Sequence, residues 1–472
     1  MQPSKDSILR KIPSVDVLLQ DAALKEAAAA GVPRQIVVDA VRAAVEETRA
    51  ALLAAPLKDI ADEEVRGRIL GQAVRRIREA WTTHYRRAIN ATGIILHTGL
   101  GRAALPAAAL RQIAGELAGY SLLQVNLETG NRSRRDERIQ WMLQQLTGAE
   151  AATIVNNNAA ATMIVLNTVA KGKEVIVSRG QLVEIGGSFR LPEVMAASAA
   201  RLVEVGTTNK THPRDYENAV TENTAAILRV HPSNYRIYGF TAEVGLAELV
   251  RIAHERNLVL IDDVGAGALL DLSRFGMTDE PTLPDSIRQG ADLVTSSADK
   301  LIGGSQAGLI LGRAAWVEKV RKNPLARILR VGKLTLAALE ATLGLFFDEA
   351  QALRDVPTLE MLVRPLPQIA EQAERIARAL GRQAPAADVK VIDGASQMGS
   401  GSLPTRDIPT RLVSVATAKM TPNALAAALR RRAPPVFARI QEDRVLFDPR
   451  TLLEGDEQPL VNAIAAVLAS GE

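Results

Sequence analysis

The sequence contains no cysteine and only five histidines among its 472 residues. The lack of cysteine excludes disulfides, thiolate zinc sites and cysteine nucleophiles, and it fits a reducing cytoplasm. The histidines are scattered without ligand spacing, so we expect no metal site. No run of about 18 apolar residues occurs, and the charged start MQPSKDSILRKIPSVD lacks the apolar core of a secretory signal. We therefore expect a cytoplasmic protein that neither spans a membrane nor is exported.

Charge and composition set only broad limits. The 57 Lys and Arg residues exceed the 53 Asp and Glu residues by four, which tolerates an anionic partner such as nucleic acid without requiring one. Hydrophobic residues make up 47% and charged residues 23%, as in ordinary globular proteins. A chain of this length exceeds what one hydrophobic core usually serves, so we predict several domains: 1–85, 86–335 and 336–472.

The first predicted domain has helical periodicity and no strand pattern. After Pro33, apolar residues recur on one helical face at Val37, Val41, Ala44, Val45 and Leu52. The domain ends in a basic cluster with aromatic neighbours, made of Arg75, Arg76, Arg78, Trp81, Tyr85, Arg86 and Arg87. Such a cluster can meet a phosphate backbone, although a solvated helix face explains the same charges equally well.

From about residue 150, short apolar runs alternate with helical stretches, a pattern typical of a parallel sheet covered by helices. The runs are AATIVNN, KEVIVSR, RLVEVGT, AAILRVH, NLVLIDDVG and ADLVTSS. A long helical pattern then extends from Lys333 to about Leu380. The strand-like runs VKVIDG, TRLVSVA and DRVLFD follow among helices and predict a smaller α+β domain. Because ligands of open α/β sheets bind at the carboxyl ends of strands, we expect the functional site there.

The stretch SSADKLIGGSQAGLILG places Lys300 just after one of these runs. A phosphate-binding loop of the Walker type requires its glycines before the lysine, and here they follow it. A partly desolvated lysine at a strand end instead suits a Schiff base with pyridoxal phosphate. A lone lysine is, however, usually a surface residue, and the glycines also fit ordinary turns.

Pyridoxal phosphate also requires a carboxylate that keeps its ring nitrogen protonated. Asp263, in LIDDVGAG, precedes Lys300 by 300 minus 263, or 37, residues, about one helix and one strand. Strand alternation directs Asp262 to the other face of the sheet, so Asp263 is the better candidate. A strand-end aspartate can equally be a simple cap.

The cofactor phosphate has two candidate partners in the sequence. Ser297 lies three residues before Lys300, and the stretch from Asn156 through Asn157 to Asn158 begins a helix whose positive end attracts anions. From these residues alone, a pyridoxal-phosphate enzyme is as good an interpretation as any other α/β enzyme.

Longer motifs make the chain resemble the bacterial L-seryl-tRNA(Sec) selenium transferases, or selenocysteine synthases, nearly from end to end. The motifs are LRKIPSVDVLL, INATGIILHTGLGRA, TGAEAATIVNNNAAA, VIVSRGQLVEIGGSFRLPEVM, LVEVGTTNKTH, SNYRIYGFT, SADKLIGGSQAGLILGR, KLTLAALEATL and QMGSGSLP. The resemblance implies a fold-type I pyridoxal-phosphate enzyme, similar to aspartate aminotransferase. It also implies a helical tRNA-binding N-terminal domain and a homo-oligomer, a ring of dimers.

The implied reaction converts L-seryl-tRNA(Sec) to L-selenocysteinyl-tRNA(Sec). Water is eliminated through an aminoacrylyl intermediate, and selenium from selenophosphate is then added. By resemblance, Lys300 carries the cofactor, Asp263 contacts its ring nitrogen and Asp299 assists proton movement. Because the α-carboxylate is esterified to ribose, arginines that match family positions, Arg102, Arg327 and Arg330, are free to hold selenophosphate.

The sequence departs from the usual family residues at Gly99, Gln181, Ala266, Ala298, Ser305 and Gly332. An alternative is therefore a pyridoxal-phosphate lyase or eliminase that acts on a small amino acid or amino-sugar phosphate without tRNA. The helical N-terminal domain favours the tRNA enzyme. A binding protein on a decayed scaffold is disfavoured by the retained lysine and aspartates, and neither a membrane nor DNA is an expected partner.

Overall fold

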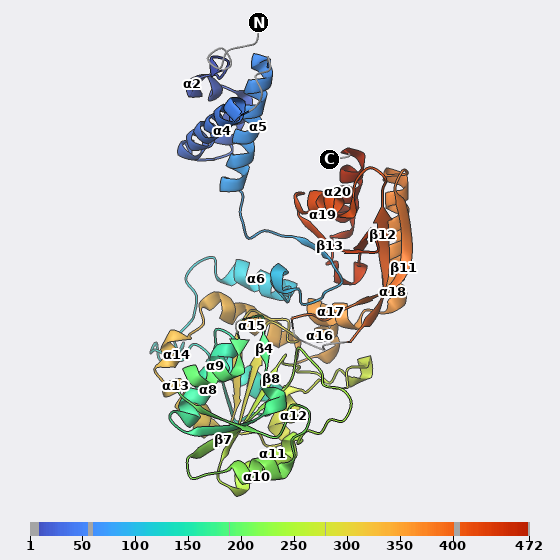
Figure 1. Cartoon of the computed structure of the whole chain (residues 1–472). Coiled ribbons are helices and arrows are strands. Elements are labelled where there is room, and N and C mark those ends of the chain that lie inside the picture. Colours follow the sequence, from blue (N-terminus) through green and yellow to red (C-terminus); the bar gives the residue numbers. More distant parts are fainter. Residues whose placement is uncertain (1–8, 55–59, 188, 279, 401–405, 471–472) are drawn as a thin grey trace. The chain divides into compact units, whose positions relative to one another are not determined.

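The computed structural model describes residues 9–54, 60–187, 189–278, 280–400 and 406–470. The chain divides into two compact units, residues 1–87 and 88–472 (Figure 1). Each unit has a hydrophobic core of its own. Parts of the motifs QMGSGSLP and VIVSRGQLVEIGGSFRLPEVM lie outside the described residues. Among the helices that are described, none is both long and apolar enough to cross a membrane.

The first unit is built from helices, as its periodicity predicts. They are α2 (Val15–Leu18), α3 (Ala22–Ala29), α4 (Arg34–Ala54) and α5 (Asp62–Trp81). The two long helices pack against each other through an apolar core that includes Val41, Ala44, Val65, Ile69 and Ala73. Arg76 in the basic cluster donates to Glu47 across this pair, with 2.8 Å between Nη2 and Oε2. The core thus leaves the charged residues on the outside of the helix pair.

The second unit contains a seven-stranded sheet in the order β2-β10-β9-β8-β7-β3-β6. The strands are β2 (Ala151–Val155), β3 (Glu174–Ser178), β6 (Arg201–Val205), β7 (Thr224–Val230), β8 (Val259–Gly265), β9 (Leu293–Ser297) and β10 (Gly308–Gly312). All six apolar runs that predicted this sheet form strands. However, β10 pairs antiparallel with both β2 and β9. The connection 298–307 is too short for the crossover that a parallel neighbour of β9 would require.

Helices cover both faces of this sheet (Figure 1). One face, here the α8 face, packs against α8 (Asn158–Ala170), α9 (Leu191–Ala197) and α13 (Ala314–Lys322). The opposite face, here the α12 face, packs against α7 (Glu137–Thr147), α11 (Leu246–Glu255), α12 (Leu283–Arg288) and α15 (Lys333–Leu345). In β8, Ile261 belongs to the first core and Leu260 to the second, as strand alternation requires.

Shorter elements connect these layers. They are η1 (Thr98–Leu100), α6 (Ala107–Glu116), η2 (Arg179–Gln181), β4 (Glu184–Ile185), β5 (Phe189–Arg190), α10 (Pro213–Ala219), η3 (Ser273–Phe275), α14 (Leu325–Ile328), α16 (Glu349–Asp355) and α17 (Pro357–Val363). The long helical pattern predicted from Lys333 is broken into α15, α16, α17 and α18 (Leu366–Gln383). Pro357 and Pro365 mark two of the breaks, because proline disfavours helical conformation in the residue before it.

A second sheet forms the small domain, in the order β1-β13-β14-β12-β11. Its strands are β1 (Ile89–Ala91), β11 (Asp388–Ser396), β12 (Ile408–Ala416), β13 (Val436–Gln441) and β14 (Arg444–Phe447), and η4 (Pro449–Thr451) follows them. The helices α18 (Leu366–Gln383), α19 (Pro422–Arg430) and α20 (Glu457–Ser470) share its core. The periodicity did not reveal β1 and β13, which pair in parallel from Ile89 and Val436. The predicted fold class, an α/β enzyme with a helical N-terminal part and a small α+β domain, is confirmed.

Candidate active site

Lys300 lies three residues beyond β9, in the loop that turns back into β10. Its side chain is buried, with 5% of the residue exposed. Hydrogen bonds from Ala298 N to Ala307 O, 2.9 Å, and from Gly304 N to Ala298 O, 2.9 Å, fix this loop. A side chain at Gly303 would collide with Val356, so close packing holds the turn after the lysine.

The surroundings of Lys300 favour its neutral amine. Burial lowers the pKa of Lys300 below its ordinary value, and the positive charge of Arg102 lowers it further. Three acidic side chains act in the opposite direction, namely Asp299, Asp263 and Glu280. A neutral amine is the form that can attack a carbonyl carbon or accept a proton.

Asp263 lies in β8 on the α8 face of the sheet, and only 3% of it is exposed. Its carboxylate accepts hydrogen bonds from Asn158 Nδ2 at 2.8 Å and from Thr162 Oγ1 at 3.1 Å. Burial raises the pKa of Asp263 above its ordinary value, although these hydrogen bonds act against the rise. A cation beside this carboxylate would offset the cost of burying its charge.

Asp262, the next residue along the same strand, faces the α12 side. Arg229 Nη1 donates to its carboxylate at 2.8 Å, and Ser286 Oγ of α12 donates at 2.7 Å. Its charge is therefore compensated within the described protein. The alternation inferred from the sequence, with Asp262 and Asp263 on opposite faces, is confirmed.

The N-terminus of α8 reaches the same edge of the sheet as Asp263. Asn157 caps the helix by accepting from Ala160 N at 2.9 Å, and its backbone carbonyl packs against Gly308 of β10. Asn158 donates a hydrogen bond from its amide nitrogen to Asp263, and its buried Oδ1 has no hydrogen-bond partner among the described residues. Ser297 is buried at the end of β9. The predicted cofactor residues thus lie on adjoining elements at the carboxyl edge.

Arg102 and Asp299 form an ion pair beside the lysine. Arg102 Nη1 lies 2.8 Å from Asp299 Oδ2, although the two residues are 197 positions apart in the sequence. Arg102 has a backbone φ of 62° in the turn after η1, a conformation that is uncommon for residues other than glycine. The turn HTGLGRA therefore directs this guanidinium toward the lysine loop.

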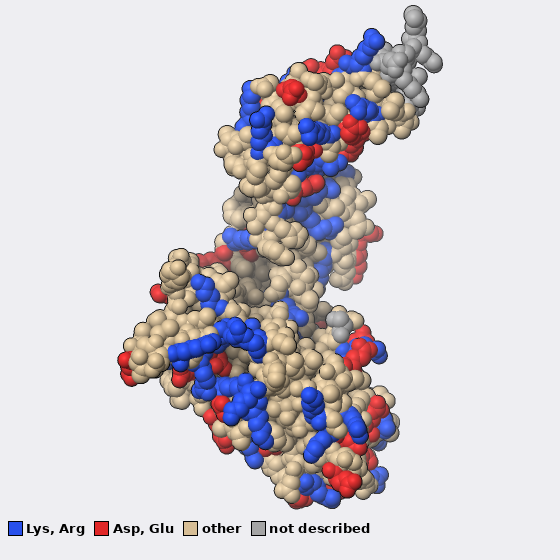
Figure 2. Space-filling view, turned by 90° about the vertical axis from the view of Figure 1, so that its left-hand side faces the viewer, with Lys and Arg blue, Asp and Glu red and all other residues tan. Residues whose placement is uncertain are grey.

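The remaining predicted arginines belong to a cluster at α14, here the arginine cluster, made of Arg132, Arg135, Arg327 and Arg330. Burial lowers the pKa of Arg135, and the positive charges of the other three lower it further. The main chain links this cluster to α8, since Asn156 N donates to Leu329 O at 3.0 Å. Figure 2, a view from the side of α13 and α14, shows Lys and Arg side chains gathered on the second unit.

Several residues of the site were missed by sequence reasoning. Ser233 follows β7, and its buried Oγ has no hydrogen-bond partner in the part of the chain that the structure describes; its position after a strand end was an available signal. Thr162 lies one turn into α8 and is recognisable only from its contact with Asp263. Arg132, Arg135 and Glu280 follow no strand, so periodicity offered no signal for them.

Comparisons with known proteins decide the family. A family model described as L-seryl-tRNA selenium transferase matches residues 88–453, and one described as selenocysteine synthase N terminal matches residues 9–49. The chain belongs to the L-seryl-tRNA selenium transferase family. The resemblance inferred from the motifs is therefore confirmed.

Relatives within the L-seryl-tRNA selenium transferase family match almost the full length. The L-seryl-tRNA(Sec) selenium transferase of Alkaliphilus metalliredigens is 44% identical and that of Solidesulfovibrio magneticus 47%. The alignments cover 98% of this chain and 99% and 98%, respectively, of those proteins. A solved structure of D-glucosaminate-6-phosphate ammonia-lyase matches with a TM-score of 0.57 at 20% identity, covering 84% of this chain and 98% of that one. At that identity the likeness shows a shared fold alone.

Proposed function

We propose that this enzyme converts L-seryl-tRNA(Sec) to L-selenocysteinyl-tRNA(Sec) with selenophosphate as the selenium donor. The names of relatives that match from end to end support the substrate. The observation that carries the chemistry is the buried Lys300 near the buried carboxylate of Asp263, together with Asn158 Oδ1 and Ser233 Oγ, which have no hydrogen-bond partner in the described structure. Buried polar groups without partners are rare in folded proteins and are typical of sites that bind a polar ligand.

The residues around Lys300 fit pyridoxal phosphate. Asp263 would hold the protonated ring nitrogen, which is the cation that its buried carboxylate lacks. Ser297 and the backbone amides of Asn157 and Asn158 would hold the phosphate at the positive end of α8. When bound, this cofactor supplies an electron sink that eases loss of the α-proton and of the β-hydroxyl from the seryl group.

The protein's own groups then move protons and orient the substrate. Lys300 Nζ would hold the cofactor in the resting enzyme, and its neutral amine would accept the α-proton of the seryl group during the reaction. The lowered pKa of Lys300 supports this role, because a neutral amine is needed for both tasks. Asp299, buried and bonded to Arg102, is placed beside the lysine to assist the proton transfer.

The selenium donor is an anion, and the arginine cluster supplies matching charge. In seryl-tRNA the α-carboxylate is an ester, so no arginine is needed for it. Arg327 and Arg330 would bind selenophosphate, and Arg102 would complete the site from the lysine side. The mutual effect of these charges on Arg135 supports the proposal, since guanidinium groups held together are stabilised by an anion.

The first unit is proposed to hold the tRNA, mainly through shape and backbone contacts, because paired RNA hides its base edges in a deep groove. Removing residues 1–85 should abolish tRNA binding in a gel-shift assay while the yellow colour of the bound cofactor is retained. Equal tRNA affinity of the truncated protein would place tRNA recognition in the second unit. The homo-oligomer, a ring of dimers by resemblance, remains a prediction.

The deciding experiment mixes the purified protein and pyridoxal phosphate with cognate seryl-tRNA and selenophosphate. Selenocysteinyl-tRNA should form, and none should form with Lys300→Ala. The parent protein should also show a visible absorption band that borohydride bleaches and that Lys300→Ala lacks. Turnover of a free amino acid or an amino-sugar phosphate, with no reaction of seryl-tRNA, would refute the proposal in favour of a lyase.

A further inference from the structure

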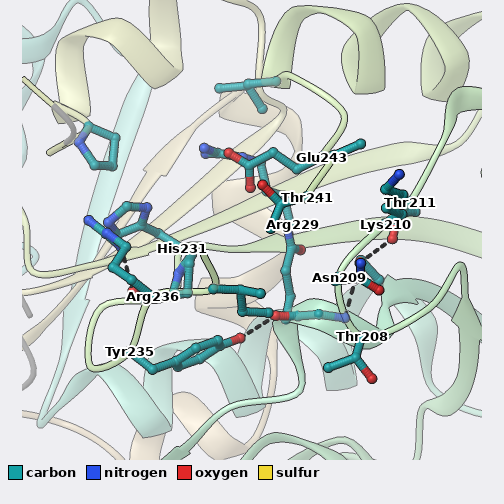
Figure 3. A pocket seen from close by; sticks show the side chains of 18 of the residues that line it. Thr208, Asn209, Lys210, Thr211, Arg229, His231, Tyr235, Arg236, Thr241 and Glu243 are labelled. Carbon is teal, nitrogen blue, oxygen red and sulfur yellow. Dashed lines mark hydrogen bonds between the residues drawn. The ribbon is translucent and has the colours of Figure 1, made fainter. Parts of the chain in front are cut away.

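A polar pocket of about 590 Å³ opens beside the lysine site on the α12 face. Its walls come from the ends of β3 and β7, from the segment that follows β6, and from α11 and α12. Figure 3 shows Tyr235, Arg236 and His231 on one side, with Asn209 and Lys210 opposite them. Neither Lys300, Asp263 nor Asn158 lines this pocket. Its volume lies within the range of small-molecule sites, about 300–1,000 Å³.

Two neighbouring buried side chains in the pocket wall carry polar atoms that have no hydrogen-bond partner among the described residues. Glu280 and His231 are each only 8% exposed, and their nearest atoms, Glu280 Oε2 and His231 Nε2, are 3.8 Å apart. Neither oxygen of Glu280 has a hydrogen-bond partner in the described structure, and neither does His231 Nε2. Unpaired groups of this kind destabilise a protein unless a ligand or water pairs with them. They therefore indicate a site built for a polar ligand.

The same two residues connect the pocket to the lysine site. The backbone N of His231 donates to the backbone O of Asp263 at 2.9 Å. His231 therefore lies next to the residue whose carboxylate is proposed to contact the cofactor. The carboxylate of Glu280 acts electrostatically on Lys300. A molecule in the pocket therefore lies within reach of the amino acid that reacts at Lys300.

The charges of the pocket favour a ligand that is polar and nearly neutral. Its basic side chains are Lys210, Arg229 and Arg236, and its acidic side chains are Glu243, Glu280 and Asp285. Arg229 is already paired with Asp262. Such a balance does not suit selenophosphate, nor a sugar acid that carries both phosphate and carboxylate, because both need an excess of cations. The arginine cluster offers that excess.

A nucleoside meets these requirements. Its ribose and base present donors and acceptors but no charge, and its base stacks on flat groups such as tyrosine or guanidinium. The wall supplies Tyr235 and Arg236 as flat groups, with Thr208 and Asn209 for hydrogen bonds. We propose that this pocket binds the 3′-terminal adenosine of the aminoacylated tRNA, which places the attached seryl group at Lys300. The inference rests on the proposed function, because seryl-tRNA carries a terminal nucleoside whereas a free amino acid or an amino-sugar phosphate does not.

The test measures binding of a fluorescein-labelled 5′-CCA-3′ RNA trinucleotide to the full-length protein by fluorescence anisotropy. Glu280→Gln should weaken binding about tenfold, since a charged hydrogen-bond acceptor is lost. Glu243→Gln, at an exposed residue of the wall, should weaken it about threefold without any risk to the core. The matched control is Glu222→Gln, an exposed residue just before β7 at the opposite edge of the sheet, and it should bind as the parent does.

Several outcomes would overturn the assignment. They are equal affinity for 5′-CCU-3′, parent-like binding by both pocket variants, or displacement of the trinucleotide by D-glucosaminate 6-phosphate. Thermal melting of Glu280→Gln separates misfolding from lost contact, and Glu243→Gln keeps the test valid if Glu280→Gln unfolds. Conversion of seryl-tRNA by the parent separates the two proposals. If conversion succeeds but the variants bind normally, only the pocket assignment fails; if conversion fails but binding depends on Glu280, only the selenium-transfer proposal fails.

Discussion

Two adjacent aspartates of β8 lie on opposite faces of the large sheet. One of these buried carboxylates has a cationic partner in the described structure, and the other does not. On the α12 face, Asp262 is paired with Arg229 and bonded to Ser286. On the α8 face, Asp263 is also deeply buried, but the described side chains that donate to it, Asn158 and Thr162 among them, are neutral. The first arrangement stabilises the folded protein, whereas the second leaves a charge that only a bound cation would balance. The proposed cofactor site therefore lies on the face where the buried carboxylate has no cationic partner among the described residues.

The strongest test of this contrast is Asp263→Asn. If Asp263 is the anionic partner of the cofactor ring nitrogen, as proposed, its replacement should lower selenium transfer by about a thousandfold or more. The measurement is kcat for selenocysteinyl-tRNA formation with saturating pyridoxal phosphate. Asp262→Asn, assayed below its melting temperature, should retain at least a tenth of the parent rate. Equal losses in both variants would mean that the two aspartates do not have separate roles.

The free energy of unfolding should show the opposite ranking, with Asp262→Asn more harmful than Asp263→Asn. Asp262→Asn leaves Arg229 partly buried without its anion and should lower the free energy of unfolding by about 3 kcal/mol. Asp263→Asn removes an uncompensated buried charge and should raise the stability of the cofactor-free protein by about 1 kcal/mol near neutral pH. Denaturant melts of the cofactor-free proteins measure both changes. A destabilised Asp263→Asn would show that Asn158 and Thr162 already compensate the charge.

A smaller effect is expected from Arg330→Ala on the α8 side. Loss of one guanidinium from the arginine cluster should raise KM for selenophosphate about tenfold and leave cofactor affinity unchanged. Arg288→Ala, an exposed arginine of α12 paired with Asp285, is the matched control on the other side. Unchanged selenophosphate kinetics in Arg330→Ala would remove this residue from the donor site.

The smallest expected effect concerns pH. Because the pKa of Lys300 is lowered in the folded protein, the unfolded chain binds more protons between that lowered value and the ordinary lysine value. The stability of the cofactor-free protein should therefore rise with pH across this window, by on the order of 1 kcal/mol relative to Lys300→Met. Parallel melts of the two proteins from pH 7 to 10 provide the difference. A difference that stays constant with pH would mean that Lys300 titrates normally.

Sequence reasoning predicted that the proposed cofactor residues share one edge of the sheet, because these residues follow a simple rule. Lys300, Asp263 and Ser297 each lie at or just past the end of an apolar run, and parallel strands bring such ends to one edge. Alternation alone separated Asp262 from Asp263. These inferences need only local periodicity and the order of the strands.

Other parts of the site depend on contacts that periodicity does not encode. The pairing of Arg102 with Asp299 joins a left-handed turn to a loop 197 residues away. Arg135 lies near enough to Arg330 for the two charges to interact, although the residues are far apart in the sequence. Glu280 lies in an irregular segment that precedes α12. The reversed direction of β10 was readable in principle from the short connection 298–307, but an apolar run carries no direction of its own.

The three-residue strand β1 has a consequence for how the chain is made. Among the described strands it pairs with β13 alone, so residues 89–91 have no strand of that sheet to join until residues 436–441 have been synthesised. The first unit precedes this strand and can fold early on the ribosome, as N-terminal domains generally do. The enzyme unit, by contrast, is closed by a contact between its first and last portions. A nascent chain that stops short of β13 is therefore left with an unpaired strand immediately before the turn that carries Arg102.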